Sequence, residues 1–314
     1  MLLDDRNDYA MATKNTPNDV MASSRTRPRV WIGRGIACAG ALVLLAQVWQ
    51  FVRGNPVVLS AFVGGTVAAI ATALGTLPVV FSQRLSDRVQ DTLFGFGAGV
   101  MLAASAFSLV IPGIAAARAG GTFGGSPWAA GSVVGSAILV GALALLMMER
   151  LLPHEHFIKG REGHSARMLR RTWLFVIAIA LHNLPEGLAI GVGYAGNEGL
   201  RADALAMGIA IQDVPEGLVV AVALLAAGYR RSFAVALGAA SGLVEPIGAV
   251  LGAAVFGYSA ALLPWGLGFA AGAMLFVISH EIIPESHRKG HEAFATGGLM
   301  VGFVLMMLLD TAMA

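Results

Sequence analysis

Cysteine and charge are both scarce in this sequence. The 314 residues include one cysteine, Cys38, which excludes a disulfide framework and a zinc site built from several thiolates. Asp, Glu, Lys and Arg together make up 13% of the chain, whereas a soluble domain carries about 25%. The mean hydropathy of +0.72 and the 40 glycines are typical of helices that pack closely within a bilayer. The composition therefore predicts an all-α polytopic membrane protein.

The first apolar run, at residues 30–52, is too long for the core of a signal peptide and is followed by no cleavage pattern. We therefore expect a retained N-terminal span, preceded by a disordered cytoplasmic tail at 1–29. Eight further apolar runs are each long enough to cross the hydrocarbon layer, and residues 56–314 are expected to form one eight-span domain. These runs fall near 56–80, 92–117, 128–150, 172–195, 202–228, 232–257, 262–284 and 293–313.

The basic residues are distributed asymmetrically along the chain. If the N-terminus is inside, every Lys and Arg except Arg53, Arg118 and Arg201 falls in a cytoplasmic segment. This distribution satisfies the positive-inside rule, and a total of eight or ten spans would scramble it. We therefore expect nine transmembrane helices, a cytoplasmic N-terminus, a periplasmic C-terminus and a cytoplasmic loop at 151–171. All five tryptophans lie at span ends, where interfacial aromatic residues belong: Trp31, Trp49, Trp128, Trp173 and Trp265.

Polar residues recur near the centres of three consecutive spans. Within the eight-span domain at 56–314, the fourth span contains HNLPEG at 182–187. The fifth contains the related QDVPEG at 212–217, and the sixth contains SGLVEP at 241–246. Their four carboxylates would cost on the order of 10 kcal/mol if they were left unpaired near the bilayer centre. Because no Lys or Arg lies at the same depth, we expect bound cations to neutralise them.

The spacing within the motifs predicts a metal site. His182, Asn183 and Glu186 share one face of a helix, and the fifth-span motif has the same arrangement. Each proline frees a backbone carbonyl and is expected to kink its helix. Antiparallel helices facing each other would bring Glu186 and Glu216 together as bridging ligands between two ions. Imidazole with carboxylate and amide oxygens suits zinc, iron(II), manganese or cadmium better than calcium.

Other functions remain open on the residues alone. A single buried His or Glu is often a hydrogen-bonded packing element, but two matched motifs disfavour that interpretation. The same carboxylates could relay protons in a proton-coupled carrier of another solute, and a passive metal sensor or scaffold is a further alternative. The fourth-span motif lacks the base and the second histidine of a His-Glu-x-x-His metalloprotease, so we expect no enzymatic function.

The fourth- and fifth-span motifs resemble those of the ZIP (Zrt-, Irt-like) metal transporters, in particular the bacterial GufA-like branch. The likeness covers residues 56–314. It implies a 3+2+3 helical core with inverted pseudo-symmetry, import of divalent metal ions toward the cytoplasm, and a location in the bacterial inner membrane. The resemblance alone also implies a homodimer, and sliding of the first, fourth, fifth and sixth family spans against the others.

The resemblance further implies a binuclear metal site. The transport site would consist of Met101, His182, Glu186, Gln212 and Glu216. The neighbouring site would consist of Asn183, Asp213 and Glu245 with the shared carboxylates of Glu186 and Glu216. The transported substrate is expected to be Zn²⁺, with Cd²⁺, Fe²⁺ or Mn²⁺ as alternatives.

The remaining histidines suggest a direction of metal movement. They lie on segments that the charge distribution assigns to the cytoplasmic side, where we hypothesise that they receive or sense released metal. A solvated polar loop is the alternative. The candidate auxiliary residues are His154, His156, His164, His280, Glu281, Glu285, His287 and His291. A separate hypothesis, against ordinary helix packing, is that an outer path is lined by Ala104, Ser108, Leu205 and Ile209.

Overall fold

The computed structural model describes residues 26–81, 86–120, 126–151, 183–196, 199–226, 228–288 and 290–313. These residues form helices and turns, and none of them lies in a β-strand. Within them, eight helical segments are long and apolar enough to cross a membrane. They are Val30–Gly54, Pro56–Val80, Asp87–Ala119, Pro127–Met148, Gly199–Leu225, Arg231–Phe256, Leu263–Ser286 and Glu292–Ala312.

These segments coincide with the expected apolar runs, so the polytopic all-α architecture is confirmed. The span expected at 172–195 is described only from residue 183 onward, and residues 183–195 are helical. The total of nine spans and the orientation of the termini stay predictions.

The chain divides into two compact units, residues 1–51 and 52–314. Helix α2, Thr26–Gly54, contains the apolar run expected to form the N-terminal span. Its side chains from Val30 to Phe51 are exposed. A helix of 29 residues is about 43 Å long at 1.5 Å per residue, which is enough to cross a bilayer.

The first long helix of the second unit begins at a well-defined cap. The side-chain oxygen of Asn55 accepts hydrogen bonds from the amides of Val57 and Val58, at 3.1 and 3.3 Å. Pro56 occupies the first helical turn, where its missing N–H leaves no helical bond broken. The cap and the proline together fix the start of α3, Pro56–Gly75, which continues as α4, Leu77–Val80.

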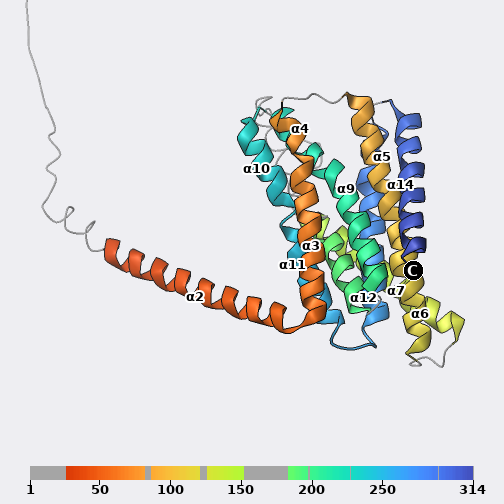
Figure 1. The fold of residues 1–314 in the computed structure, drawn as a ribbon, viewed down its shortest axis with the longest axis horizontal. Helices are drawn as coiled ribbons and strands as arrows, with labels where there is room; N and C mark the ends of the chain where they lie inside the picture. The colour runs from red at the N-terminus through yellow and green to blue at the C-terminus, as the bar shows by residue number, and fades with distance from the viewer. Residues whose placement is uncertain are drawn as a thin grey trace, which may run out of the picture. The chain divides into compact units, whose positions relative to one another are not determined.

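The helices of the second unit pack side by side, and their contacts define two sets (Figure 1). In the first set, α3 packs against α9, Gly199–Ala226, and against α11, Val244–Phe256. Helix α10, Arg231–Ser241, packs against both α3 and α9. The helix at 183–195 joins this set, because the backbone of Gly187 meets the backbone of Glu245 in α11.

The second set consists of two closely packed helix pairs. Helix α5, Asp87–Ala103, lies along α14, Glu292–Ala312. Helix α7, Pro127–Leu151, lies along α12, Leu263–Val277. The two pairs are joined through the segment that follows α5, which contacts both α12 and α14.

The packing within a set differs in character from the packing between the sets. Gly217 of α9 meets the backbone carbonyl of Thr72 on α3 so closely that a Cβ would collide with it. Between the sets, Gly208 of α9 faces the flexible side chain of Met306 on α14. Backbone contact therefore fixes α9 to α3, whereas the described contact of α9 with α14 at this point involves a side chain that can rearrange.

The sixth span is not the single helix that the apolar run at 232–257 predicted. Helix α10 ends at Ser241, a turn follows at Gly242, and α11 begins at Val244. In one continuous helix the ring of Pro246 would clash with the carbonyl of Gly242, four residues earlier. The break therefore places the glutamate of this motif in the first turn of a new helix.

Two π-helical segments interrupt the spans Asp87–Ala119 and Leu263–Ser286. The first, η1, Ala104–Val110, separates α5 from α6, Ile111–Ala119. The second, η2, Ile278–Ile282, separates α12 from α13, Ile283–Ser286. A proline follows each segment closely and removes a helical hydrogen bond there. Two of the proposed path residues, Ala104 and Ser108, therefore lie in a π-helical segment and not in a regular α-helix.

Candidate metal centre

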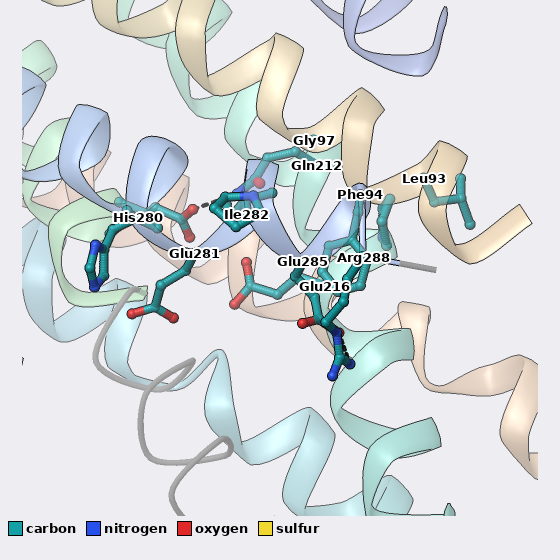
Figure 2. A pocket seen from close by; sticks show the side chains of 14 residues that line it. Leu93, Phe94, Gly97, Gln212, Glu216, His280, Glu281, Ile282, Glu285 and Arg288 are labelled. Carbon is teal, nitrogen blue, oxygen red and sulfur yellow. Dashed lines mark hydrogen bonds and ion pairs between the residues drawn. The ribbon is translucent and has the colours of Figure 1, made fainter. Parts of the chain in front are cut away.

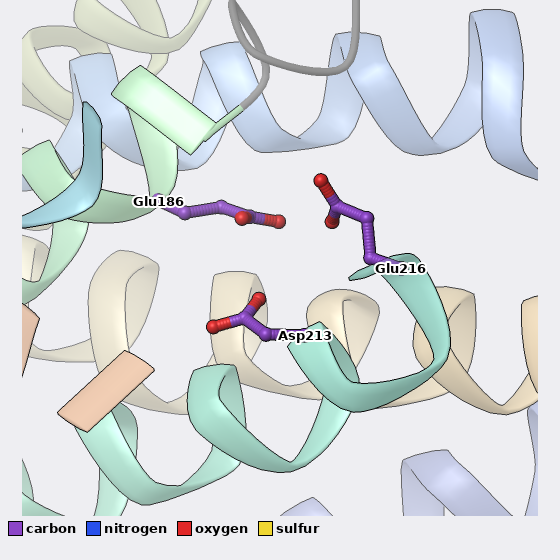
Figure 3. Close-up of side chains that lie close together, drawn as sticks. All are labelled: Glu186, Asp213 and Glu216. Atoms are coloured by element: carbon purple, nitrogen blue, oxygen red, sulfur yellow. The ribbon is translucent and has the colours of Figure 1, made fainter. Parts of the chain in front are cut away.

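Three carboxylates converge between the fourth- and fifth-span motifs. Glu186 projects from the helix at 183–195, and Asp213 and Glu216 project from α9 (Figure 3). One oxygen from each of these side chains lies within 4.8 Å of the corresponding oxygens of the other two. Glu186 and Asp213 are each 1% exposed. The fold thus brings the two related motifs together around one point, and it buries their negative groups.

Gln212 links two of these carboxylates. Its amide nitrogen donates to Glu186 Oε1 at 2.7 Å and to Asp213 Oδ1 at 2.6 Å. Gln212 itself is 2% exposed. The two hydrogen bonds occupy one oxygen of each carboxylate and leave the other oxygen of each group free for a further partner.

Glu245 joins the cluster from the break in the sixth span. It occupies the first turn of α11, where the helix dipole favours a negative side chain. Its Oε1 accepts hydrogen bonds from the Thr72 hydroxyl at 2.9 Å and from Asn183 Nδ2 at 3.3 Å. Asn183 belongs to the fourth-span motif, so its hydrogen bond ties Glu245 to that motif. The break therefore directs a fourth carboxylate toward the same centre.

Five side chains of this cluster each retain a buried oxygen without a hydrogen-bond partner. A buried acceptor left in this state costs about 1–3 kcal/mol, so five of them in one place need a common explanation. Elsewhere among the described residues, only Ser105 Oγ has the same property. Converging oxygen lone pairs are the donor set of a divalent cation. The five atoms are Asn183 Oδ1, Glu186 Oε2, Asp213 Oδ2, Glu216 Oε1 and Glu245 Oε2.

The other sequence-predicted residues of the centre and the path have different surroundings. His182 lies outside the described residues. Ser108 donates to Asp310 Oδ1 of α14 at 2.7 Å, so its hydroxyl already has an acidic partner. The remaining predicted residues are buried in one apolar core cluster: Met101, Ala104, Leu205 and Ile209.

A cavity of about 280 Å³ adjoins the carboxylate cluster (Figure 2). Glu186, Gln212 and Glu216 contribute to its wall. The other lining residues come mainly from α5, η2 and α13. Three predicted auxiliary residues line it: His280, Glu281 and Glu285. Arg288, which the sequence analysis did not single out, also lines it and pairs with Glu285 at 2.6 Å.

The two other described auxiliary histidines lie in hydrogen-bond networks. Both ring nitrogens of His287 have protein partners: Nδ1 bonds the Ile283 carbonyl at 2.9 Å, and Nε2 lies 3.3 Å from the Thr296 hydroxyl. His291 Nδ1 lies 2.9 Å from Asp91 Oδ2, whose residue is 1% exposed. These contacts connect the start of α14 to α13 and α5. The loop histidines lie outside the described residues: His154, His156 and His164.

Four polar residues that the sequence analysis did not select make side-chain hydrogen bonds or ion pairs with residues that it did select: Thr72, Asp91, Arg288 and Asp310. Each is polar within or beside an apolar span, which was the available signal. Their partners are distant in sequence in all cases but that of Arg288, so spacing along one helix could not reveal them.

The fold and the centre together define a multi-pass membrane protein with a buried cluster of carboxylates whose oxygens lie close enough to hold a metal ion. Residues 154–310 match the family described as "ZIP Zinc transporter". The chain belongs to this family, as the resemblance of the motifs suggested.

Similar proteins include bacterial and animal members. The chain is 47% identical to "Zinc transporter ZIPB" of Bordetella bronchiseptica over 93% of its own length and 94% of the relative. It is 46% identical to "Zinc transporter GufA" of Myxococcus xanthus, over 80% of this chain and 98% of that one. The human "Zinc transporter ZIP11" is 32% identical over 83% of this chain and 99% of that one. Membership of this family makes the chain a transporter of the inner membrane and not an enzyme.

Proposed function

We propose that this protein imports Zn²⁺ into the cytoplasm through a binuclear site at mid-membrane. The observation that carries the proposal is the convergence of five buried oxygens without hydrogen-bond partners. A permanent positive side chain would neutralise the carboxylates but would also block an exchangeable ion. Among the residues described, no Lys or Arg contributes a hydrogen bond or ion pair to the cluster. Mobile divalent cations therefore explain the arrangement better than a structural charge pair.

The donor set divides between two adjoining positions. Glu186 and Glu216 bridge them, and each bridging carboxylate contributes to both ions. The transport position is completed by Met101, His182 and Gln212. The neighbouring position is completed by Asn183, Asp213 and Glu245. Because these oxygens and one imidazole form a borderline set, we include Cd²⁺, Fe²⁺ and Mn²⁺ as alternative substrates.

We place the transporter in the membrane with its N-terminus in the cytoplasm and its C-terminus in the periplasm. The distribution of Lys and Arg supports this orientation. Nine spans follow from the eight described crossings together with the partly described helix at 183–195. In this arrangement residues 1–29 are a tail, 30–52 an added span, and 56–314 the transport domain, with a cytoplasmic loop at 151–171.

Alternating access is supported by the two helix sets. Close backbone contacts, such as that of Gly217 with Thr72, join helices within the first set. The contact of Gly208 with Met306 across the sets involves a flexible side chain. We propose that the set carrying the carboxylates moves as one body against the other. The homodimer rests on the family resemblance alone.

The cavity next to the cluster supports release toward the cytoplasm. It is lined by the acidic side chains of Glu281 and Glu285, and both lie on segments that the charge distribution assigns to the inner side. An ion leaving Glu216 would thus meet further oxygen ligands before it reaches water. We propose the same auxiliary role for His280 and, with the loop, for His154, His156 and His164.

Uptake into liposomes tests this function. Purified protein reconstituted in liposomes should take up zinc, and both Glu186→Ala and Glu216→Ala should abolish the uptake. Glu292→Ala, an exposed glutamate at the start of α14, is the matched control and should transport normally. Normal zinc uptake by both cluster variants would refute the site.

The second candidate function is a proton-coupled carrier of another solute, which the burial of several carboxylates favours as well. The two functions differ in their response to metal. A metal transporter should be stabilised against thermal unfolding by zinc, and its uptake of zinc should respond to an imposed zinc gradient. Proton transport without metal, combined with no thermal stabilisation by zinc, would favour the carrier instead.

A further inference from the structure

Among the hydrogen bonds described, Thr72 is the one donor to the carboxylate cluster that lies outside the three central motifs. Its hydroxyl lies 2.9 Å from Glu245 Oε1, across 173 residues of sequence. Thr72 is 0% exposed, so water does not compete for this bond. A hydrogen bond to a charged acceptor is about twice as strong as one between neutral groups.

The other threonines of the same helix segment behave differently. The hydroxyls of Thr66 and Thr76 bond only to backbone carbonyls, each at 2.7 Å. The Thr72 hydroxyl lies farther from its own backbone acceptor, Ala68 O, at 3.2 Å. Its closer acceptor is Glu245, and the single hydroxyl hydrogen is directed to the carboxylate.

Backbone packing fixes Thr72 relative to Glu245. The carbonyl of Thr72 lies against Gly217 of α9. Its side chain lies against Gly242, where a Cβ would come within 2.9 Å of the hydroxyl oxygen. A β-branched side chain in a helix also has few rotamers. Three segments, α3, α9 and the break before α11, therefore hold the hydroxyl in one place.

The consequence for Glu245 is an inequality between its two oxygens. Oε1 accepts from Thr72 and Asn183, whereas Oε2 is buried with no partner. Only Oε2 has its lone pairs free for an ion. Carboxylates that bind through one oxygen suit small four-coordinate ions such as Zn²⁺. Larger ions commonly take both oxygens of a carboxylate.

We propose that Thr72 is a positioning residue that holds Glu245 as a one-oxygen ligand and thereby favours zinc over larger divalent ions such as Cd²⁺. The inference rests on the proposed function, because it assumes that the cluster binds metal. Helix α3 contains none of the predicted metal ligands, and the inference gives it a part in ion selectivity through Thr72.

Equilibrium binding of Zn²⁺ and Cd²⁺ to the purified full-length protein in detergent tests the inference, with a coloured chelator as competitor. Thr72→Val keeps the shape of the side chain and removes the hydroxyl. It should raise the affinity for Cd²⁺ relative to Zn²⁺ by about tenfold, in the range found for residues that support metal ligands. Thr72→Ser restores the donor and should keep the native ratio. Thr76→Val, which removes a hydroxyl that bonds only backbone, is the matched control.

Absorption spectroscopy at the cadmium edge gives an independent readout. Thr72→Val should gain oxygen neighbours around bound Cd²⁺, because Glu245 Oε1 keeps only the bond from Asn183 and one of its lone pairs becomes available. An unchanged affinity ratio, or an equal loss of affinity for both ions, would overturn the role in selectivity. If Thr72→Val does not fold, Thr72→Ala removes the same hydroxyl with less bulk, and the same two outcomes apply to it.

Wild type and Glu186→Ala separate this inference from the proposed function. If wild type binds neither ion, or if Glu186→Ala binds both like wild type, the metal site itself is wrong. If wild type binds, Glu186→Ala does not, and the ratio is the same in Thr72→Val, then only the role of Thr72 is wrong.

Discussion

The amide nitrogen of Gln212 lies 2.7 Å from Glu186 Oε1 and donates a hydrogen bond to it. The same nitrogen donates to Asp213, so one neutral group supports two buried carboxylates. An amide has two hydrogens to donate and carries no charge. It therefore stabilises the carboxylates without acting as a permanent cation that an incoming metal ion must displace.

Replacement of the Gln212 amide should make the thermal stability of the protein depend more strongly on bound metal. Gln212→Glu exchanges a hydrogen-bond donor for another carboxylate, which repels Glu186 and Asp213. We expect a lower melting temperature in EDTA than wild type, and a larger increase on addition of zinc, since binding to the folded state stabilises it. Gln50→Glu, on an exposed face of α2, is the control. Equal melting temperatures and equal zinc responses in wild type and Gln212→Glu would contradict the role of the amide.

Two glycines of α9 should respond differently to the same substitution. Gly217→Ala sets a methyl group against the backbone carbonyl of Thr72, which cannot move without moving α3. We expect a loss of about 1–3 kcal/mol in the free energy of unfolding, typical of overpacking. Gly208→Ala meets the end of the Met306 side chain, which can repack, and makes an ordinary contact with Val100, so it should lose less.

Thermal unfolding in detergent compares the two variants under one condition. If Gly208→Ala is as destabilised as Gly217→Ala, the contact between the helix sets is as rigid as the contacts within them. The structural support for a sliding movement would then be lost.

The sequence predicted the helices, their approximate ends and the residues of the central motifs. Periodicity indicates which residues share a face of a helix, and carboxylates within apolar spans indicate where a neutralising partner is expected. Both signals are local in the sequence. The sequence also contained a signal for the broken sixth span, since the ring of Pro246 opposes a helical bond to Gly242, although Pro215 lies inside the unbroken α9. The apolar run extends across the break, and hydropathy alone therefore predicted one helix.

Partners on other helices could not be predicted in this way. Thr72 and Glu245 are 173 residues apart, and Asp91 and His291 are 200 residues apart. A helical pattern gives the direction of a side chain but not the helix that it faces. The donor role of Gln212 was missed for the same reason, because it depends on Glu186 approaching from another span.

His291 should have a structural role that is separable from metal binding. Its Nδ1 contacts the buried carboxylate of Asp91 on α5, so His291→Ala leaves that carboxylate without this partner. We expect a loss of about 1–3 kcal/mol in the free energy of unfolding, measured in EDTA. Glu292→Ala, the exposed neighbour, should change stability little. Weaker zinc binding by His291→Ala with unchanged stability in EDTA would instead support the auxiliary metal role.

Arg288 is the one Lys or Arg among the residues that line the described cavity, and we expect its charge to weaken zinc binding. Its ion pair with Glu285 is partly exposed, with side chains 53% and 34% accessible, so it contributes at most about 1 kcal/mol to stability. Arg288→Gln should therefore unfold at nearly the temperature of wild type. The variant removes a charge that repels cations and occupies Glu285, and we expect zinc to bind up to about fivefold more tightly.

Salt dependence identifies the electrostatic origin of this effect. Mobile ions screen exposed charges, so the difference in zinc affinity between Arg288→Gln and wild type should shrink from low to high salt. Arg231→Gln removes an exposed charge that contacts the carbonyl of Val80 away from the cavity, and it should leave zinc affinity unchanged at both salt concentrations. Equal affinity in Arg288→Gln and wild type at low salt would show that Arg288 does not act on the ion. A tighter affinity that persists at high salt would indicate a rearranged cavity, because an electrostatic effect of an exposed charge is weakened by screening.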